Sequence, residues 1–516
     1  MTSPKIKNPA RAHENVLKPG RNCFEIANAL RATVLVDAKA YFAALEKAFQ
    51  SAARSIVIIG WDFDGRMRLR PQDGDDAPAI GTMLRKLVEE RPELEVRILV
   101  WSLAIVHTPS ASSSLLLGDS WNDHERINLR LDTNHPLHAA HHQKIVMVDD
   151  ALAFVGGMDL TVDRWDTPEH RANEPLRVTP DGEPCRPVHD VQMMLDGPIV
   201  AVVKRVAQMR WRDATGEELP EVAVDDRWLS HLDPDFRNLP VAIARTAPRL
   251  DGTVAIEETW PLTVDMLRSA KTSVYIEAQY FTAKKLRPIL REVLSREHPP
   301  EIVVVCPLNA NGVIERFFMG ANRERLLRSI SQADHAGKLR LYHSVVPDED
   351  GNETEVLIHS KVMIVDDRVL RVGSANLNNR SIGLDTECDV AIESDRPEVR
   401  DTILRIRNRL LAEHLGCDPA QVDAAMAEGG SMVGAIERLS HRGQRHLRPL
   451  VVSPGPRHSF PGTRLVDPVR PFGPVEAFHR LWRRLFFQRE SATPNSRGAS
   501  NSLARKTAPP SARGTR

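Results

Sequence analysis

The sequence predicts an α/β protein made of two α/β/α sandwich halves with mixed sheets, related by a pseudo-two-fold axis and sharing one site at their interface. Three observations support this prediction. A polar motif occurs twice in the 516 residues, the same order of elements surrounds both copies, and strands alternate with helices through most of the chain. Such alternation typically gives a sheet that helices cover on both faces.

The duplicated motif has the form H-x-K-x4-D. Its residues are His142, Lys144 and Asp149 in the first copy and His359, Lys361 and Asp366 in the second. A turn follows each copy at the same distance, Gly156-Gly157-Met158-Asp159 and Gly373-Ser374-Ala375-Asn376. One such motif would be a weak signal in a chain of this length. Two copies with the same trailing turn indicate a single site built from both halves.

The elements of the two halves follow one another in the same order. In the first half, β-branched runs predict strands at 55–61, 94–101, 144–148, 152–155 and 190–195, and helical spacing predicts helices near 37–53, 80–92 and 198–211. In the second half, the corresponding strands are 273–280, 301–306, 361–365, 369–372 and 387–393, and the helices lie near 260–271, 283–297 and 397–414. In each half, an Asp-Asp turn joins the strand that carries the motif lysine to the next strand.

These elements divide the chain into seven parts. We expect an N-terminal extension (1–34), a first half (35–211), a connector (212–250), a second half (251–416), a C-terminal helix with a wrapping segment (417–474), a basic amphipathic helix (475–489) and a disordered tail (490–516). The segment 417–474 combines a helical stretch near 419–439 with an extended stretch rich in Pro and Arg, 444–474.

Residues 475–489 place large apolar side chains at helical spacing beside several arginines. Two interpretations stay open. The helix could lie on an anionic membrane surface, or it could dock on the protein core.

Composition narrows the class of protein. Basic and acidic residues balance, 69 against 69, which argues against binding nucleic acid through bulk charge. The five cysteines are scattered and never spaced as C-x-x-C, as expected for a reduced, cytoplasmic protein. No apolar stretch is long enough for a membrane helix, so we expect a protein that is soluble or peripheral on the inner face of a membrane. We also expect it to be a monomer.

A group of histidines precedes the first motif: His135, His138, His141 and His142. Their spacing could suggest a metal cluster, but no cysteine lies nearby and His142 already belongs to the repeat. We therefore expect no metal ion and no cofactor.

Two histidines and two lysines suit the cleavage of a phosphodiester. On a strand, residues i and i+2 face the same side, so each motif can point its histidine and lysine into a shared cleft. One imidazole can attack phosphorus while the other protonates the departing alcohol. The lysines would neutralise the phosphate oxygens, with Ser374 and Asn376 as further donors. Asp190 and Glu387, one in each half, are candidates to orient the imidazoles.

These residues resemble the phospholipase D superfamily over positions 35 to 416. The likeness to its phospholipid-cleaving branch lies in 58–64, 156–160, 164–168, Val188-His189-Asp190 and 276–281. The resemblance implies that His142 is the nucleophile, that His359 is the acid and base, and that Asp149 and Asp366 brace the site. Trp61, Asp159, Trp165 and Tyr280 are candidates for the substrate pocket, although aromatic residues at strand ends also fill protein cores.

The expected reaction is hydrolysis of the head-group phosphodiester of a glycerophospholipid to phosphatidic acid, with water or an alcohol as acceptor. Three alternatives stay open. They are a phosphatidyltransferase similar to cardiolipin synthase, a nuclease, and an inactive lipid-binding protein on the same fold.

Overall fold

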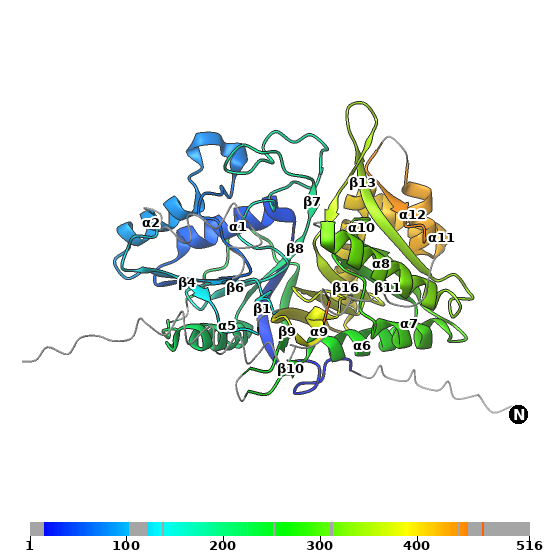
Figure 1. The fold of residues 1–516 in the computed structure, drawn as a ribbon, viewed down its shortest axis with the longest axis horizontal. Helices are drawn as coiled ribbons and strands as arrows, with labels where there is room; N and C mark the ends of the chain where they lie inside the picture. The colour runs from blue at the N-terminus through cyan, green and yellow to red at the C-terminus, as the bar shows by residue number, and fades with distance from the viewer. Residues whose placement is uncertain are drawn as a thin grey trace, which may run out of the picture. The chain divides into compact units, whose positions relative to one another are not determined.

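Strands of both halves form one hydrogen-bonded series in the computed structural model (Figure 1). The structure describes residues 15–102, 121–136, 139–223, 225–250, 253–309, 313–441, 444–452 and 467–468. The series runs β4-β3-β2-β5-β6-β8-β1-β9-β18-β17-β16-β11-β12-β13. Read outward from the central β1–β9 pair, both halves show the same succession of antiparallel and parallel pairs. This repetition confirms the predicted fold class.

The first-half strands are β1 (Glu25–Val36), β2 (Ser55–Gly60), β3 (Glu95–Trp101), β4 (Ile127–Asp132), β5 (Ile145–Val148), β6 (Leu152–Gly156), β7 (Val188–His189) and β8 (Val191–Asp196). The second-half strands are β9 (Phe236–Ala247), β10 (Ile256–Glu257), β11 (Ser273–Ala278), β12 (Glu301–Val305), β13 (Leu339–Pro347), β14 (Glu353–Glu355), β15 (Leu357–Ile358), β16 (Lys361–Val365), β17 (Val369–Gly373), β18 (Glu387–Glu393) and β19 (His446–Pro449).

The helices are α1 (Asp37–Ser51), α2 (Ile80–Glu90), α5 (Ile199–Thr215), α6 (Thr259–Ser269), α7 (Leu286–Leu294), α8 (Val313–Ile330), α9 (Arg380–Gly383), α10 (Pro397–Leu415), α11 (Pro419–Gly429) and α12 (Met432–Leu439), with a short 3-10 helix at Pro71–Asp76.

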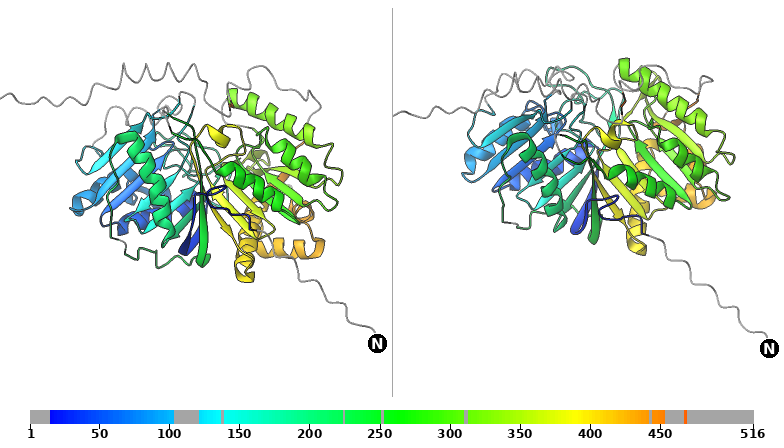
Figure 2. Two further views of the ribbon diagram at one scale, coloured as in Figure 1. Left: turned by 90° about the horizontal axis from the view of Figure 1, so that it is seen from below. Right: turned by 60° about the horizontal axis from the view of Figure 1, so that its bottom comes forward.

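Helices cover both faces of each sheet (Figures 1 and 2). On one face of the first-half sheet, α1 and α2 pack over alternate residues of β2, and α6, α7 and α8 do the same for β11 in the second half. The opposite faces share one apolar cluster with α5 and α10, in which Val57 and Tyr275 represent the two sheets. The alternation of strand residues between these clusters follows from the two-residue period of a strand. Among the described residues, no helix is long and apolar enough to cross a membrane.

The two central strands correct the expected boundaries. The sequence predicts an extension over 1–34 and a connector over 212–250, yet β1 begins at Glu25, β9 spans Phe236–Ala247, and the two strands pair from Glu25↔Ile243 to Ala32↔Phe236. Both strands are hard to recognise in the sequence because small alanines stand among their buried residues, and because Pro240 interrupts the β-branched pattern of β9. These strands join the halves into one sheet system.

The C-terminal expectations are met only in part. The helical stretch near 419–439 consists of two helices, because Gly430 adopts a left-handed φ of 63° that ends α11. In the wrapping segment, His446–Pro449 pairs with β13. Residues 475–489 and 490–516 lie outside the described residues.

The aspartates of the two motifs brace the scaffold. Asp149 accepts hydrogen bonds from the backbone N–H groups of residues 53, 54 and 55 at 2.6 to 2.8 Å, and Asp366 does the same for residues 271, 272 and 273 at 2.8 to 2.9 Å. Each thus holds the turn between a helix and the neighbouring strand. Neither carboxylate contacts a histidine or a lysine of the motifs among the described residues, which agrees with the bracing role that the family resemblance implies.

We predict that Asp366→Ala lowers the free energy of unfolding by about 3 kcal/mol, because several backbone donors lose a charged acceptor. Urea unfolding followed by circular dichroism measures this change. The exposed Asp350→Ala serves as the control, and equal stability of the two variants would contradict the bracing role.

Candidate active site

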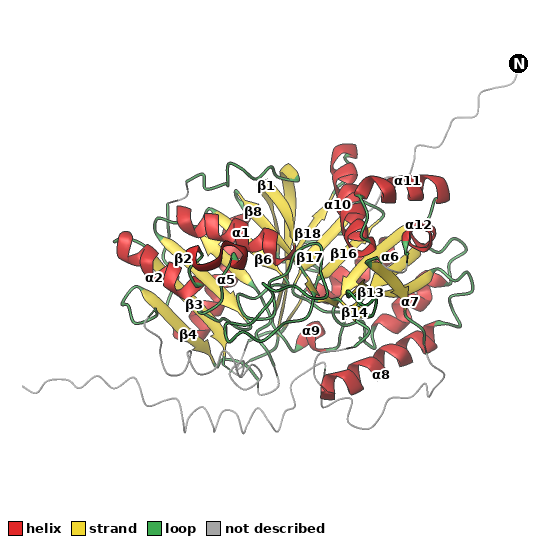
Figure 3. Cartoon of the chain, turned by 90° about the horizontal axis from the view of Figure 1, so that it is seen from above, coloured by secondary structure: helices red, strands yellow, loops and turns green. Residues whose placement is uncertain are grey.

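Loops from both halves gather where the sheets meet (Figure 3), and the two motif histidines contact backbone of opposite halves there. Each histidine is fixed by backbone of the opposite half. The N–H of His142 donates to the carbonyl of Thr386 at 3.0 Å, and the N–H of His359 donates to the carbonyl of His189 at 2.8 Å. The parallel pair β7–β15 continues this exchange. The two motifs are therefore held together by main-chain contacts that do not depend on a ligand.

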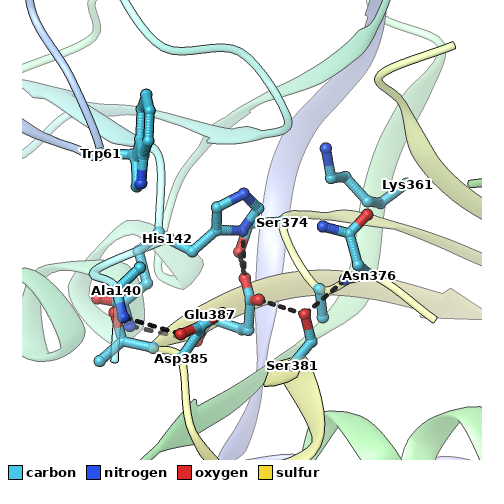
Figure 4. Close-up of polar contacts among 12 residues, drawn as sticks. Trp61, Ala140, His142, Lys361, Ser374, Asn376, Ser381, Asp385 and Glu387 are labelled. Carbon is cyan, nitrogen blue, oxygen red and sulfur yellow. Dashed lines mark hydrogen bonds and ion pairs between the residues drawn. The ribbon is translucent and has the colours of Figure 1, made fainter. Parts of the chain in front are cut away.

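The carboxylates that orient the histidines are also exchanged between the halves. His142 Nδ1 lies 3.0 Å from Glu387 Oε2 (Figure 4), and His359 Nδ1 lies 2.6 Å from Asp190 Oδ2. The sequence predicts both carboxylates, one in each half. The structure brings each of them to the motif histidine of the other half, so neither motif histidine is oriented by the carboxylate of its own half.

Two serine hydroxyls hold Glu387 in place. Ser374 Oγ donates to Glu387 Oε2 at 2.5 Å, and Ser381 Oγ donates to Oε1 at 2.6 Å (Figure 4). Ser374 is fully buried and also accepts from the N–H of Cys388. Its predicted role as a phosphate donor is therefore corrected to positioning Glu387. Ser381, at the start of α9, was missed because its sequence surroundings resemble an ordinary helix start.

The trailing turns differ between the halves for a steric reason. A Cβ added at Gly157 would lie 2.1 Å from Asp190 Oδ1, so only glycine admits the Asp190 carboxylate there. The equivalent position in the second half is Ser374, whose side chain reaches Glu387 instead. The Gly-Gly turn thus leaves room for the Asp190 carboxylate, and the Gly-Ser turn supplies a hydroxyl that donates to Glu387.

The two lysines have unlike surroundings. Lys144 Nζ forms an ion pair with Asp159 Oδ2 at 3.1 Å, whereas Lys361 Nζ donates to Gln279 Oε1 at 3.1 Å and lies 3.3 Å from His359 Nδ1. Asn376 lies beside Lys361 in Figure 4, and its buried Oδ1 has no hydrogen-bond partner among the described residues. The first-half cation therefore forms an ion pair with a carboxylate, while the second-half cation donates to an amide and lies within electrostatic reach of Asp190.

Burial and neighbouring cations favour neutral imidazoles. Burial lowers the pKa of His142 well below its ordinary value, and Lys144 and Lys361 lower it further. Burial likewise lowers the pKa of His359, with Lys361 and the half-buried Arg164 adding to the effect. Burial also lowers the pKa of the Lys361 ammonium to about 7 and raises the pKa of the Glu387 carboxyl to about 7. A neutral His142 is the form that can act as a nucleophile.

Two family models match the chain, one in each half. The model described as Phospholipase D matches residues 48–238, and the model described as Cardiolipin synthase, PLD-like domain, matches residues 263–410. The chain belongs to the phospholipase D superfamily.

Individual members of the superfamily are distant from this chain. Phospholipase D alpha 1 of Nicotiana tabacum is 25% identical over 397 residues, which cover 54% of this chain and 49% of the tobacco protein. Phospholipase D A of Dictyostelium discoideum is 23% identical and covers 74% of this chain and 35% of that protein. The chain thus spans about half the length of these relatives or less.

A similarity to a solved structure supports the fold. The phosphatidylserine synthase of Haemophilus influenzae Rd KW20 matches with a TM-score of 0.50 and 12% sequence identity, covering 89% of this chain and 95% of that chain. At this identity the likeness concerns the fold alone.

The residues predicted for a substrate pocket lie in several places. Asp159 faces Lys144 and accepts from the N–H of Trp61 at 2.8 Å, and the Trp61 ring lies 5.7 Å from that of Trp101. Trp165 lines a cavity of about 710 Å³ together with Trp121, Met67 and Val178. Tyr280 is half-buried at the end of β11. Their role in substrate binding stays a prediction.

The remaining histidines near the first motif have polar partners of their own. His141 Nε2 lies 3.2 Å from Asp132 Oδ2 and 2.8 Å from a guanidinium nitrogen of Arg210, and His135 Nε2 lies 3.0 Å from Ser102 Oγ. His138 lies outside the described residues.

We predict that kcat/KM falls about tenfold per pH unit below pH 7, because protonation removes the Glu387 carboxylate that accepts from His142 Nδ1. The sign follows from the raised pKa of Glu387, whose carboxyl takes up a proton as the pH falls through about 7. Glu387→Gln should lower kcat by roughly a hundredfold or more and abolish this acid limb. Rates measured across pH 5 to 9 test both points.

The exposed Glu398→Gln is the matched control and should retain the wild-type profile. An unchanged acid limb in Glu387→Gln would contradict the assignment.

Proposed function

We propose that the protein is a phospholipase D-type phosphodiesterase that hydrolyses the head-group phosphodiester of glycerophospholipids to phosphatidic acid. The observation that carries this proposal is the exchanged pair of histidine–carboxylate contacts at 3.0 and 2.6 Å. Each contact occupies Nδ1, which leaves Nε2 as the nitrogen that can react. Two such imidazoles flanked by two lysines match the needs of phosphoryl transfer without further protein groups.

In the first step, His142 Nε2 attacks phosphorus and a phosphorus–nitrogen bond forms as the bond to the head-group oxygen breaks. Protonated His359 gives its proton to that oxygen, so the head group leaves as a neutral alcohol. In the second step, water attacks the phosphohistidine, His359 takes the proton of the water, and the electrons of the phosphorus–nitrogen bond return to His142. The division of roles between the two histidines rests on the family resemblance.

The charges of the site explain how His359 acquires its proton. Without an anion, burial and the surrounding cations hold the pKa of His359 low. A bound phosphodiester adds a negative charge beside Lys361 and His359, which raises the pKa of both groups. Substrate binding thus lets His359 take up from water the proton that the departing alcohol requires.

An alcohol can replace water in the second step, so transphosphatidylation should compete with hydrolysis. A phosphatidyltransferase similar to cardiolipin synthase is the second candidate. It is favoured by the description of the second-half family model and by the phosphatidylserine synthase fold neighbour. The balanced net charge disfavours a nuclease, and the intact pairs of histidine and lysine disfavour an inactive lipid-binding protein. A monomeric cytoplasmic protein that meets anionic membranes through residues 475–489 completes the proposal.

We predict that the wild-type protein converts mixed phospholipid vesicles with ethanol into phosphatidic acid and phosphatidylethanol, both detectable by mass spectrometry. His142→Ala should abolish both products because no phosphohistidine can form. The exposed His441→Ala is the control and should match the wild type. Phosphatidylglycerol converted mainly to cardiolipin would favour the transferase, and comparable products from His142→Ala would overturn the mechanism.

A substrate with a p-nitrophenol head group separates the two histidines, because this leaving group needs no acid. His359→Ala should release a burst of about one equivalent of p-nitrophenol per chain and then stall at the phosphohistidine. His142→Ala should show no burst. A burst in His142→Ala would reverse the assigned roles.

A further inference from the structure

A second group of titratable side chains lies buried behind the active site. Asp37, His170 and His189 have no exposed surface, and Glu413 is 8% exposed. They come from the start of α1, the loop before β7, β7 itself and the end of α10. The proposed reaction uses none of them. Their placement joins the first half, which supplies three residues, to Glu413 of the second half.

The potential ligand atoms of these four residues converge. His189 Nδ1 lies 2.6 Å from Glu413 Oε1 and 3.1 Å from Asp37 Oδ1. His170 Nε2 lies 3.2 Å from Glu413 Oε1 and 3.6 Å from Asp37 Oδ2. Zinc bonds of about 2.0–2.1 Å in a tetrahedron place neighbouring ligand atoms about 3.4 Å apart. The four contacts scatter around that value, and one ligand atom from each of the four residues lies within 4.8 Å of the others.

The other nitrogen of each imidazole is already held by a carboxylate. His170 Nδ1 lies 3.0 Å from Asp166 Oδ2, and His189 Nε2 lies 3.0 Å from Glu277 Oε2. Histidines that bind metals characteristically have such a partner on the nitrogen away from the ion, which fixes the ring and raises its basicity. His170 Nε2 and His189 Nδ1 therefore both point at the carboxylates of Asp37 and Glu413.

One oxygen of the cluster lacks a hydrogen bond. Asp37 Oδ2 is fully buried and has no hydrogen-bond partner among the described residues. A buried carboxylate oxygen without a donor is costly, and a cation between the four residues would remove that cost. This observation is independent of the spacing of the ligands and points to the same place.

The charges balance with a divalent cation. Arg177 pairs with Asp166 at 2.9 Å, and the half-buried Arg445 faces Glu413 and Asp37. Of the three negative charges of Asp37, Glu277 and Glu413, two are therefore left to be neutralised inside the protein. In the absence of a metal, His170 and His189 would each have to carry an extra proton. A divalent ion that displaces the protons on His170 Nε2 and His189 Nδ1 leaves the total charge unchanged.

We propose that Asp37, His170, His189 and Glu413 form a structural site for a divalent transition-metal ion, for which zinc is the best match. Four protein ligands and no exposed position suit a closed tetrahedral site. Nitrogen and oxygen ligands without cysteine also accept cobalt. The site is separate from the phosphate chemistry, so the metal-free catalytic step inferred from the sequence is unaffected.

The position of the site gives it a mechanical role. The N–H of Asp37 donates to the carbonyl of Asp190 at 2.9 Å, and the carbonyl of His189 accepts from His359 at 2.8 Å. A metal ion at these residues fastens the backbone that carries Asp190 and His359 to α10 of the second half. The ion thereby stabilises the contact between the halves.

The test uses the full-length protein, stripped with a chelator and then loaded with zinc or cobalt alone. After loading with zinc and dialysis, elemental mass spectrometry should find about one zinc ion per chain. Cobalt should give the intense visible absorption of a tetrahedral site, and loading at neutral pH should release about two protons per ion. A wild-type protein that retains less than a tenth of an equivalent of either metal would overturn the proposal.

Variants separate this site from adventitious binding. His170→Gln should reduce the bound zinc at least tenfold, and Glu277→Gln, which keeps all four ligands, should weaken zinc binding by roughly 10–100-fold. His414→Gln removes a histidine of the same buried cluster that is not a ligand, and should keep its zinc.

Equal zinc in His170→Gln and His414→Gln would contradict the ligand assignment. If a variant fails to fold, the cobalt spectrum and the proton count of the wild type still decide. None of these readouts depends on phospholipid cleavage, so the proposed function can fail or succeed separately.

Discussion

The exchange of carboxylates between the two halves is the interaction on which the site depends. His142 is oriented by Glu387 and His359 by Asp190, and the main-chain contacts of both histidines also cross between the halves. Neither duplicated unit can orient its own imidazole. The central β1–β9 pair, the shared apolar cluster around α5 and α10, and the β7–β15 pair all serve to bring the units into this register.

Duplication has left the halves similar in architecture and different in chemistry. The first half combines Lys144 with Asp159 and has glycine where the second half has Ser374. In the second half, Lys361 donates to the amide of Gln279, and two hydroxyls hold the carboxylate of Glu387. Burial and nearby cations lower the pKa of both histidines, so two neutral imidazoles lie in these unlike surroundings.

The sequence predicted the halves, most of their strands and the motif residues, since these follow from periodicity and from an exact repeat. It did not predict β4, β13 or α8, nor β1 and β9, where small residues and Pro240 weaken the strand pattern. It predicted Asp190 and Glu387 as orienting residues but did not predict that each contacts the histidine of the other half. A sequence repeat indicates which residues are equivalent, but not which of them are in contact. Ser374 was assigned to phosphate for a similar reason, as its contact with Glu387 arises from tertiary packing.

Nuclear magnetic resonance of the ring nitrogens tests the exchanged orientation most directly. In protein labelled with ¹⁵N-histidine, the low-field proton on His142 Nδ1 should disappear in Glu387→Gln and persist in Asp190→Asn, and the proton on His359 Nδ1 should behave in the opposite way. Loss of the His142 signal in Asp190→Asn, with no effect of Glu387→Gln, would show that each half orients its own histidine and would contradict the account.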